Sequence, residues 1–276
     1  MKKVLALVLA VTMLFMAFSF AGCGKTETKP AEGETAKQKL IVGFDAEFPP
    51  FGFIATDGDP VYDNYDGFDL AVAKELCNRL GWEFEAKAID WDSKDAELKS
   101  GSINCIWNGF TYTGRETEYE WSEPYYDNSI VAVVKADSGI KTLADLSGKV
   151  IMAQAASSAV EAVEGNEAFN TSLKEMIELP DYNTGFMELN QGTVDAVAAD
   201  LGVANFQIAN NSGAYVILEE PISTEQYAVG FLKGNTELRD AVNAELLKMA
   251  EDGTMMNIAK GYESAGLTLA ALCLCK

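Results

Sequence analysis

The sequence predicts an α/β protein built from two successive units, each of which alternates short apolar strands with helices. Strands and helices alternate along residues 40–107 and again along residues 143–252, which is typical of parallel sheets covered by helices. In both units, polar residues that can bind a small molecule stand where a predicted strand ends. These two observations define the fold class, and the individual elements follow in chain order.

The first unit starts with an apolar strand at residues 40–44, and Pro49-Pro50 prevents this strand from continuing. Apolar residues recur at helical spacing over residues 68–80, and Gly81 provides the stop signal for that helix. Similar patterns predict a strand at 84–89, a helix at 92–99, a strand at 103–107 and a β-branched strand at 130–134.

The second unit repeats the alternation. A short helix and turn at residues 143–149 precede a strand at 150–153, and Ser157 and Ser158 open the next helix. The later elements are a helix containing 186–190 and stopped near Gly192, strands at 194–199 and 216–218, a β-rich run at 226–232, and a helix at 235–252 ended by Gly253. The chain therefore contains two α/β units.

Four polar residues stand at or just beyond the ends of predicted strands: Asp45 and Thr111 in the first unit, and Ser157 and Asp200 in the second. Open α/β sheets bind ligands in the crevice beyond the carboxyl ends of their strands. Two sheets that face each other across a cleft would bring these four side chains together. We therefore expect one ligand site between the units.

Residues 106–115 have the composition of a socket for a small carboxylic acid. The stretch begins as an apolar strand and changes at Gly109, where the missing side chain allows another group to approach the backbone closely. Thr111 and Thr113 offer hydroxyl donors, and Arg115 offers a planar fork that can hold a carboxylate with two hydrogen bonds. The alternative for this segment is an exposed hairpin loop with a surface arginine.

The first 38 residues predict export and membrane attachment. Lys2 and Lys3 precede an uncharged apolar run, and small residues then lead to Cys23, which resembles a bacterial lipoprotein signal. We expect a signal peptide at 1–22, lipidation of Cys23, and a flexible tether at 23–38 that has no large apolar residue. The alternative is an uncleaved transmembrane anchor, and either arrangement places the body of the protein outside the cytoplasmic membrane.

Composition mainly excludes classes of function. The chain has 42 acidic and 21 basic residues and a formal charge of −21, which argues against nucleic acid as a partner. The absence of histidine excludes histidine-based triads and argues against an ordinary zinc site. We expect no metal and no cofactor. A disulfide between Cys77 and Cys105 remains open, and the tail at 271–276, with Cys273 and Cys275, has no interpretation.

Six motifs occur in order along the chain: DAEFPPF at 45–51, GFDLAVAKEL at 67–76, the segment 107–115, WSEPYY at 121–126, LADLSGK at 143–149 and GTVDA at 192–196. Together they resemble the polar amino-acid substrate-binding proteins of ABC importers, a family with the type II periplasmic-binding-protein fold. The resemblance implies two Rossmann-like lobes joined by two crossing strands, with the ligand cleft between them. Lobe 1 would comprise residues 39–134 and 226–270, and lobe 2 would comprise residues 135–225.

The resemblance also implies how a bound amino acid would be held. Arg115 would clamp the α-carboxylate, together with Thr111 and the helix start at 157–158, since a helix N-terminus attracts an anion. Asp200 would accept the α-ammonium together with the Gly109 carbonyl. A helix-capping role remains the alternative for Asp200 and for the first of the two serines.

Other residues would contact the side chain of the amino acid. Phe48 and Trp91 would sandwich it, and Asp45 would touch its distal end, whereas core packing is the alternative for both aromatic residues. The remaining candidates for the ligand site are Asn108, Phe110, Gln154, Gln226 and Tyr227.

The leading functional hypothesis is a monomeric, lipid-anchored receptor that is not an enzyme. It would bind a free polar L-amino acid and deliver it to an ABC permease in the membrane. One alternative is an enzyme of the same fold that dehydrates cyclic amino-acid precursors by carboxylate chemistry, but we expect no second carboxylate beside Asp45 or Asp200. The other is a sensor subunit that presents its ligand to a signalling protein. The sequence does not identify the amino acid.

Overall fold

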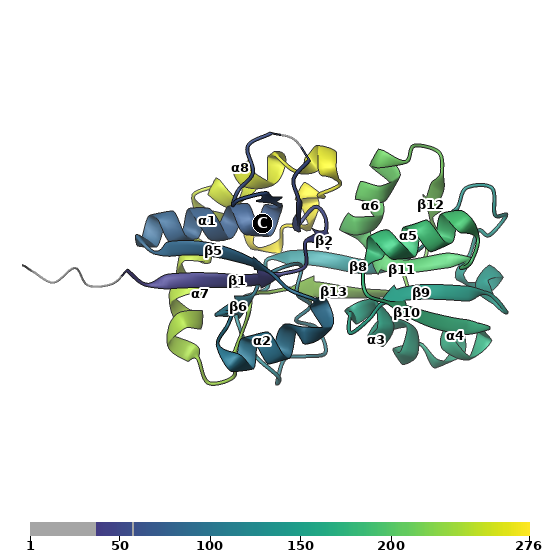
Figure 1. Ribbon diagram of the computed structural model, residues 1–276, viewed down its shortest axis with the longest axis horizontal. Coiled ribbons are helices and arrows are strands. Elements are labelled where there is room, and N and C mark those ends of the chain that lie inside the picture. Colours follow the sequence, from purple (N-terminus) through teal and green to yellow (C-terminus); the bar gives the residue numbers. More distant parts are fainter. Residues whose placement is uncertain (1–36, 57) are drawn as a thin grey trace, which may run out of the picture. The chain divides into compact units, whose positions relative to one another are not determined.

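The computed structural model describes residues 37–56 and 58–276 (Figure 1). The expected signal peptide, Cys23 and nearly all of the tether lie outside the described residues. Across the described part of the chain, no helix is both long and apolar enough to cross a membrane.

The first lobe is built around a five-stranded sheet in the order β5-β1-β6-β14-β7. Its strands are β1 (Lys39–Phe44), β5 (Glu83–Ala88), β6 (Cys105–Ile106), β7 (Glu120–Trp121) and β14 (Gly230–Phe231). The helices around it are α1 (Phe68–Leu80), α2 (Lys94–Ser100), α7 (Thr236–Glu251) and α8 (Thr254–Lys260). Strand β1 runs parallel to β5 and β6, so their carboxyl ends meet at one edge of the sheet.

Helix α1 shows why the limits of an amphipathic helix can be predicted from the sequence. Its predicted limits are confirmed, and its apolar side chains are buried along one stripe that includes Phe68, Val72 and Leu76. The helix ends at Gly81, whose φ of 68° is the left-handed conformation that glycine adopts without strain.

A small sheet that the sequence patterns did not predict follows β1. Strands β2 (Glu47–Phe48), β3 (Gly52–Ile54) and β4 (Tyr65–Asp66) form it by antiparallel pairing. Two- and three-residue strands are too short to show an alternating apolar pattern, which explains why they were missed.

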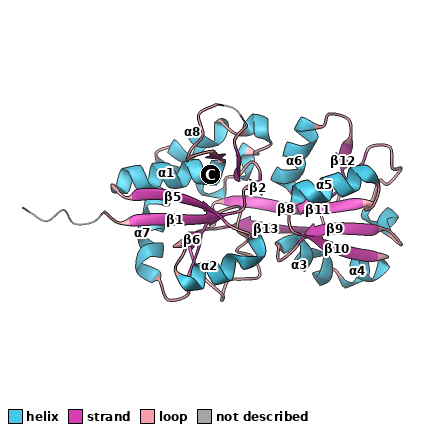
Figure 2. Ribbon diagram, in the orientation of Figure 1, coloured by secondary structure: helices cyan, strands magenta, loops and turns pink. Residues whose placement is uncertain are grey.

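The second lobe is built around a sheet in the order β10-β9-β11-β8-β12, and β13 also pairs with β8. Its strands are β8 (Tyr126–Lys135), β9 (Val150–Gln154), β10 (Glu175–Leu179), β11 (Ala196–Asp200), β12 (Tyr215–Ile217) and β13 (Ser223–Tyr227). Its helices are α3 (Ser158–Gly165), α4 (Glu167–Ser172), α5 (Tyr182–Gln191) and α6 (Leu201–Asn210). Helices α5 and α6 lie on one face of the sheet, and α3 and α4 lie on the other (Figure 2).

The chain passes from the first sheet to the second between β7 and β8, and it returns between β13 and β14. The crossing strands β8 and β13 pair antiparallel, with Asn128 opposite Glu225 and Tyr126 opposite Tyr227. From Ile130 onward, β8 also pairs with β11 and so belongs to the second sheet. The expected lobe boundaries, 39–134 with 226–270 and 135–225, stay a prediction.

The C-terminal tail packs against the start of β8. Leu272 forms an isolated bridge with Tyr126, and the Cys273 Sγ lies 3.2 Å from the Pro124 carbonyl oxygen. The last residue, Lys276, forms an ion pair of 2.8 Å with Asp127. All four cysteines of the described residues are free thiols, including the buried Cys77 and Cys105.

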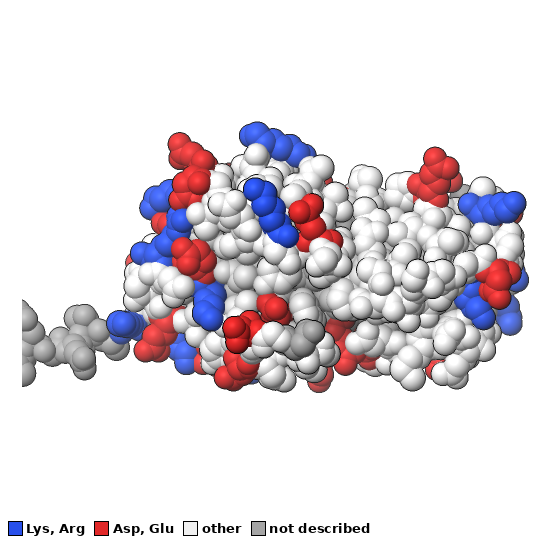
Figure 3. All heavy atoms as spheres, turned by 90° about the horizontal axis from the view of Figure 1, so that it is seen from above, with Lys and Arg blue, Asp and Glu red and all other residues white. Residues whose placement is uncertain are grey.

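Charge is unevenly distributed over the described residues. Helix α6 contains no charged side chain, and α5 contains a single one, Glu188. Figure 3 accordingly shows few charged side chains over the middle of the face that carries these two helices. The acidic excess must therefore lie elsewhere, and part of it lines the cleft described next.

Candidate binding site

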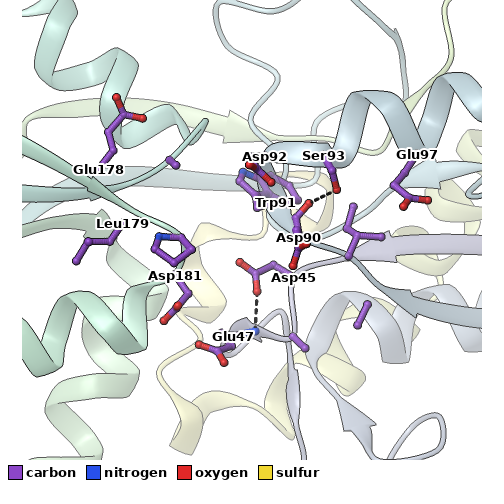
Figure 4. Close-up of a pocket in the computed structure, with 15 residues that line it drawn as sticks. Asp45, Glu47, Asp90, Trp91, Asp92, Ser93, Glu97, Glu178, Leu179 and Asp181 are labelled. Carbon is purple, nitrogen blue, oxygen red and sulfur yellow. Dashed lines mark hydrogen bonds between the residues drawn. The ribbon is translucent and has the colours of Figure 1, made fainter.

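An open pocket of about 820 Å³ lies where strand ends of the two sheets meet (Figure 4). Residues after β1 and β5 line one side, and residues at the end of β10 and after β9 line the other. Its lining contains seven carboxylate side chains and no lysine or arginine: Asp45, Glu47, Asp90, Asp92, Glu97, Glu178 and Asp181. We call this region the acidic pocket.

Asp45 is the most enclosed carboxylate that the structure places at the inner wall of this pocket, with 7% of its surface exposed. Its Oδ1 accepts a hydrogen bond from the Glu47 backbone N–H at 2.8 Å, and its Oδ2 accepts one from Gln154 Nε2 at 2.6 Å. Burial raises the pKa of Asp45 above its ordinary value, and these donors oppose that effect. Burial, followed by hydrogen bonding with Asp181, raises the pKa of Glu47 to about 7.

A second, dry group of residues surrounds Asp200, which is 2% exposed. Its Oδ1 accepts hydrogen bonds from Tyr227 at 2.5 Å and Asn128 at 2.8 Å, and its Oδ2 accepts one from Tyr182 at 3.1 Å. The side chain makes no capping hydrogen bond to α6, although the residue occupies the N-cap position. The helix-cap alternative for Asp200 is therefore wrong as an account of its side chain.

Glu225 completes this group and was missed by the sequence patterns. Its Oε1 accepts hydrogen bonds from Asn128 Nδ2 at 2.9 Å, Thr111 Oγ1 at 3.0 Å and Ser158 Oγ at 3.2 Å. Burial, followed by the charge of Asp200, raises the pKa of Glu225 to about 7. We call these seven residues the hinge cluster: Thr111, Asn128, Ser158, Tyr182, Asp200, Glu225 and Tyr227.

The expectation that no second carboxylate lies beside Asp45 or Asp200 is wrong. Glu225 shares the Asn128 amide with Asp200, and the charge of Asp45 contributes to the raised pKa of Glu47. Strand alternation could have indicated Glu225, because side chains two residues apart on a strand lie on the same face. Glu225 therefore shares a face with Tyr227, which was already a candidate for the ligand site. Gln226 lies on the opposite face, where its Nε2 donates to Asp127 at 2.8 Å.

Arg115 is 6% exposed and points to the second lobe. Its Nε and Nη2 both donate to Oε1 of Glu161 on α3, at 3.3 and 2.7 Å, and its guanidinium lies 5.6 Å from the centre of the Phe110 ring. The Arg115 guanidinium is thus buried and binds a carboxylate of the second lobe. The alternative of a surface arginine on an exposed loop is wrong.

The loop that precedes Arg115 is fixed by a buried carboxylate of α1. Asp69 is fully buried, and its Oδ2 accepts hydrogen bonds from the Gly109 N–H at 2.6 Å and from Tyr125 at 2.7 Å. Burial raises the pKa of Asp69 to about 7. Gly109 has a φ of 54°, and a Cβ there would lie 2.7 Å from the Phe48 ring and 3.0 Å from the Tyr227 ring, so only glycine fits.

The predicted aromatic residues divide between the cleft wall and the core. Trp91 lines the acidic pocket with its ring packed edge-on against Phe110, whereas Phe110 itself is fully buried. Phe48 is 6% exposed, and its ring centre lies 6.0 Å from that of Tyr182 in the other lobe. Asn108 is also buried and accepts the Asp45 backbone N–H at 3.0 Å, so it orients the end of β1.

Several polar contacts join the two lobes across the cleft. Besides the Asp45–Gln154 and Arg115–Glu161 pairs, Lys94 Nζ donates to the Ala156 carbonyl oxygen at 3.0 Å. Lys94 is buried beside Trp91 and was not among the predicted site residues. Ser157, which the sequence placed at the ligand, instead turns its hydroxyl to the Gln154 carbonyl oxygen at 2.7 Å and makes no side-chain cap.

The chemistry of this cleft is that of recognition by hydrogen bonds and charge. The hinge cluster contains two carboxylates, and the open acidic pocket contains seven more, of which Glu97 is already paired with Lys87 at 2.9 Å. No group of three or more histidine, cysteine, aspartate or glutamate side chains within residues 37–56 and 58–276 is arranged to hold a metal ion.

Comparison with known proteins identifies relatives over nearly the whole described chain. The model of the family described as bacterial extracellular solute-binding proteins, family 3, matches residues 40–265. An L-cystine-binding protein of Bacillus subtilis is 32% identical over 285 residues, covering 95% of this chain and 97% of that protein. An arginine-binding extracellular protein of the same organism is 29% identical over 268 residues, covering 95% and 98%.

Solved structures of similar proteins support the same assignment. An ABC uptake transporter substrate-binding protein from Streptococcus pneumoniae with bound histidine superposes with a TM-score of 0.77 at 31% identity. The match covers 83% of this chain and 94% of that protein. The two-lobed fold that the sequence motifs implied is confirmed.

Proposed function

Because the chain belongs to the family 3 bacterial extracellular solute-binding proteins, we propose that it is the substrate-binding protein of an ABC importer for a polar amino acid with a cationic side chain. The observation that carries this proposal is the presence of two acidic regions between the lobes, the hinge cluster and the acidic pocket. The first would receive the α-ammonium, and the second would receive a distal cation.

The hinge cluster supports recognition of the amino end. Asp200 is a buried carboxylate whose partners are all neutral, so an ammonium group would supply the positive charge that it lacks. Arg115 would supply the matching group for the α-carboxylate by exchanging Glu161 for the ligand. Both charged ends of a zwitterion would then be held in a largely dry cleft.

The acidic pocket supports the choice of a cationic side chain. Asp45, Asp90 and Asp181 lie around one space, and Trp91 adds an aromatic wall beside them (Figure 4). The named ligands of similar proteins include arginine and histidine, and also cystine and glutamine. The absence of any lysine or arginine from the pocket lining favours the basic members of this series.

Transport rather than turnover is the proposed role. The named relatives are binding proteins, which supports a protein without catalytic activity. The Asp200–Glu225 pair is the observation that would favour carboxylate catalysis, and unchanged amino acid after prolonged incubation, followed by NMR, would exclude it. The sensor alternative differs only in its partner.

Membrane attachment through lipid on Cys23 is part of the proposal and rests on the sequence signal alone. The protein would act as a monomer outside the cytoplasmic membrane, within reach of its permease. Labelling with a radioactive or clickable fatty acid tests the anchor, and absence of label from the full-length protein would refute it.

A thermal-shift series with L-arginine, L-lysine, L-histidine, L-glutamine and L-cystine tests the central proposal. A ligand at 100 times its Kd stabilises the folded state by about 2.7 kcal/mol through mass action. We expect the largest rise of the melting temperature with L-arginine or L-lysine. A larger rise with L-glutamine or L-cystine would refute the cationic side chain, and no rise with any of the five would refute amino-acid binding.

A further inference from the structure

Glu225 is a buried carboxylate that has no role when Asp200 and Arg115 alone bind the two charged ends of a zwitterion. It lies on crossing strand β13, opposite Asn128 on crossing strand β8. The Asn128 Nδ2 donates both to Glu225 Oε1 at 2.9 Å and to Asp200 Oδ1 at 2.8 Å, so one amide bridges two carboxylates. Glu225 and Asp200 are 7% and 2% exposed, which leaves little water to compensate their charges.

The partners of this pair are neutral in the described residues. Thr111, Asn128, Ser158, Tyr182 and Tyr227 supply the hydrogen bonds, and burial keeps the pKa of each tyrosine well above its ordinary value. Three other charged groups near this pair have partners of their own: Asp127 on β8 with Lys276, Asp181 before α5 with Thr184, and Arg115 with Glu161 on α3.

We propose that Asp200 and Glu225 together form the seat of the α-ammonium, and that this ammonium replaces a proton which the two carboxylates share in the empty cleft. The inference rests on the proposed function and deepens it, because it assigns Glu225 to ligand recognition. Binding then releases a proton from the pair to the solvent, while the positive charge of the ligand takes its place.

The sign of the pH dependence follows from this exchange. Burial raises the pKa of both carboxylates, that of Glu225 to about 7, and an ammonium held between them lowers both again. Affinity therefore rises with pH while the empty pair is still protonated, by at most about tenfold per pH unit for one proton. It levels off above about pH 8, where the empty pair has already lost that proton.

A competing arrangement would have the opposite sign. Glu225 accepts hydrogen bonds from the hydroxyls of Thr111 and Ser158, and the sequence assigned the Thr111 hydroxyl and the helix start at 157–158 to the α-carboxylate of a ligand. If Glu225 were only a stand-in for that carboxylate, the ligand would displace it, and the displaced group would take up a proton in the dry cleft. Removal of its charge would then strengthen binding.

Isothermal titration calorimetry of L-arginine distinguishes the two arrangements. If L-arginine does not bind, whichever of L-histidine, L-glutamine and L-cystine binds takes its place. Titrations at pH 6.5 in two buffers with different ionisation enthalpies give the number of protons exchanged. The variant is Glu225→Gln, which keeps an acceptor for Thr111 and Ser158, and the matched control is the exposed Glu220→Gln.

We expect wild type and Glu220→Gln to release a fraction of a proton per bound amino acid, and Glu225→Gln to release clearly less. Any proton that the distal cation displaces from Glu47 in the acidic pocket is common to all three proteins. At pH 8 the Glu225→Gln variant should bind more weakly by about tenfold, while its melting temperature without ligand is unchanged or higher. With L-arginine as the ligand, the difference in proton release between Glu220→Gln and Glu225→Gln should persist with agmatine, which keeps the amine, and vanish with 5-guanidinopentanoate, which lacks it.

Three results would overturn the inference: proton uptake on binding, equal proton release by wild type and Glu225→Gln, or tighter binding by Glu225→Gln. Each of them is compatible with amino-acid binding, so the proposed function would survive. Failure of every amino acid to bind would instead refute the proposed function and the inference with it.

Discussion

The hinge cluster and the acidic pocket are both rich in carboxylates, yet the carboxylates of the two regions differ in their exposure to water. Asp200 and Glu225 are nearly enclosed and share one amide, whereas six of the seven carboxylates of the acidic pocket are half-buried or exposed. A buried charge must be matched by a specific proton or cation, because desolvation costs several kcal/mol. A solvated charge attracts cations over a distance but discriminates little among them.

This contrast assigns different tasks to the two regions. The hinge cluster would select molecules that have an α-ammonium. The acidic pocket would attract ligands with a positively charged side chain and favour their binding. Substitutions in the first region should therefore have large effects that depend on ligand structure. Substitutions in the second should have small effects that depend on salt.

The largest expected effect is that of Asp200→Asn. Loss of one partner of a buried, hydrogen-bonded charge pair costs about 2–5 kcal/mol, so the affinity for L-arginine should fall by that amount in calorimetry. Binding of 5-guanidinopentanoate, which has no ammonium for Asp200, should change far less. Equal losses for the two compounds would contradict the assignment, and the exposed Asp137→Asn serves as the control.

Arg115→Ala should come next. The guanidinium is buried and holds the carboxylate of Glu161, so its removal should weaken amino-acid binding by several kcal/mol through loss of a charge-assisted clamp. Its matched variant is Glu161→Gln, which removes the competing charge and should strengthen binding by up to about 1 kcal/mol, since Glu161 is largely exposed. Unchanged affinity of Arg115→Ala for L-arginine would show that the α-carboxylate binds elsewhere.

A third dry carboxylate, Asp69, extends the comparison from binding to stability. Its pKa rises from an ordinary 3.8 to about 7 in the folded protein, so its contribution to stability is complete below pH 4 and is lost as the pH rises through 7. For each pH unit by which the folded pKa exceeds the unfolded pKa, the free energy of unfolding falls by at most about 1.4 kcal/mol once the pH is above both values. Asp69→Asn should remove this part of the pH dependence.

Thermal unfolding of the ligand-free protein between pH 4 and 8 measures the effect. The difference in melting temperature between Asp69→Asn and wild type should grow in favour of the variant as the pH rises. A constant difference over this range would show that Asp69 is ionised throughout. Asp137→Asn again controls for the loss of one negative charge at an exposed site.

The sequence predicted the elements that have a long repeating pattern. Helix α1 and strands β1, β9 and β11 lie within a few residues of their expected positions, since periodic burial requires a periodic apolar pattern in the chain. The run at 226–232 was expected as one strand but is divided between β13 and β14, which belong to different sheets. Such divisions depend on which strands pair, and a local sequence pattern does not contain that information.

The candidate site shows the same limit. Asp45, Asp200 and Arg115 were predicted because they follow strands or belong to motifs, and in the fold each of them bonds to a residue of the other lobe or of a crossing strand. Asn128 and Glu225 were missed because neither ends a strand nor belongs to a motif that was read for function. Their meeting depends on the antiparallel register of β8 with β13, which only the three-dimensional structure supplies.

The smallest expected effect is that of Glu178→Gln in the acidic pocket. Glu178 is exposed on the second lobe and lines the pocket without a described hydrogen bond of its side chain, so its charge acts mainly through solvent. Loss of such a charge should weaken L-arginine binding by about 0.2–1 kcal/mol at low salt, and the difference should largely vanish at 0.5 M salt, where screening acts within a few ångströms. L-Glutamine, which has no distal charge, should be unaffected at either salt concentration. A salt-independent loss of more than about 2 kcal/mol would place Glu178 in direct contact with the ligand, and the division between a dry recognition region and a solvated attracting region would then be wrong.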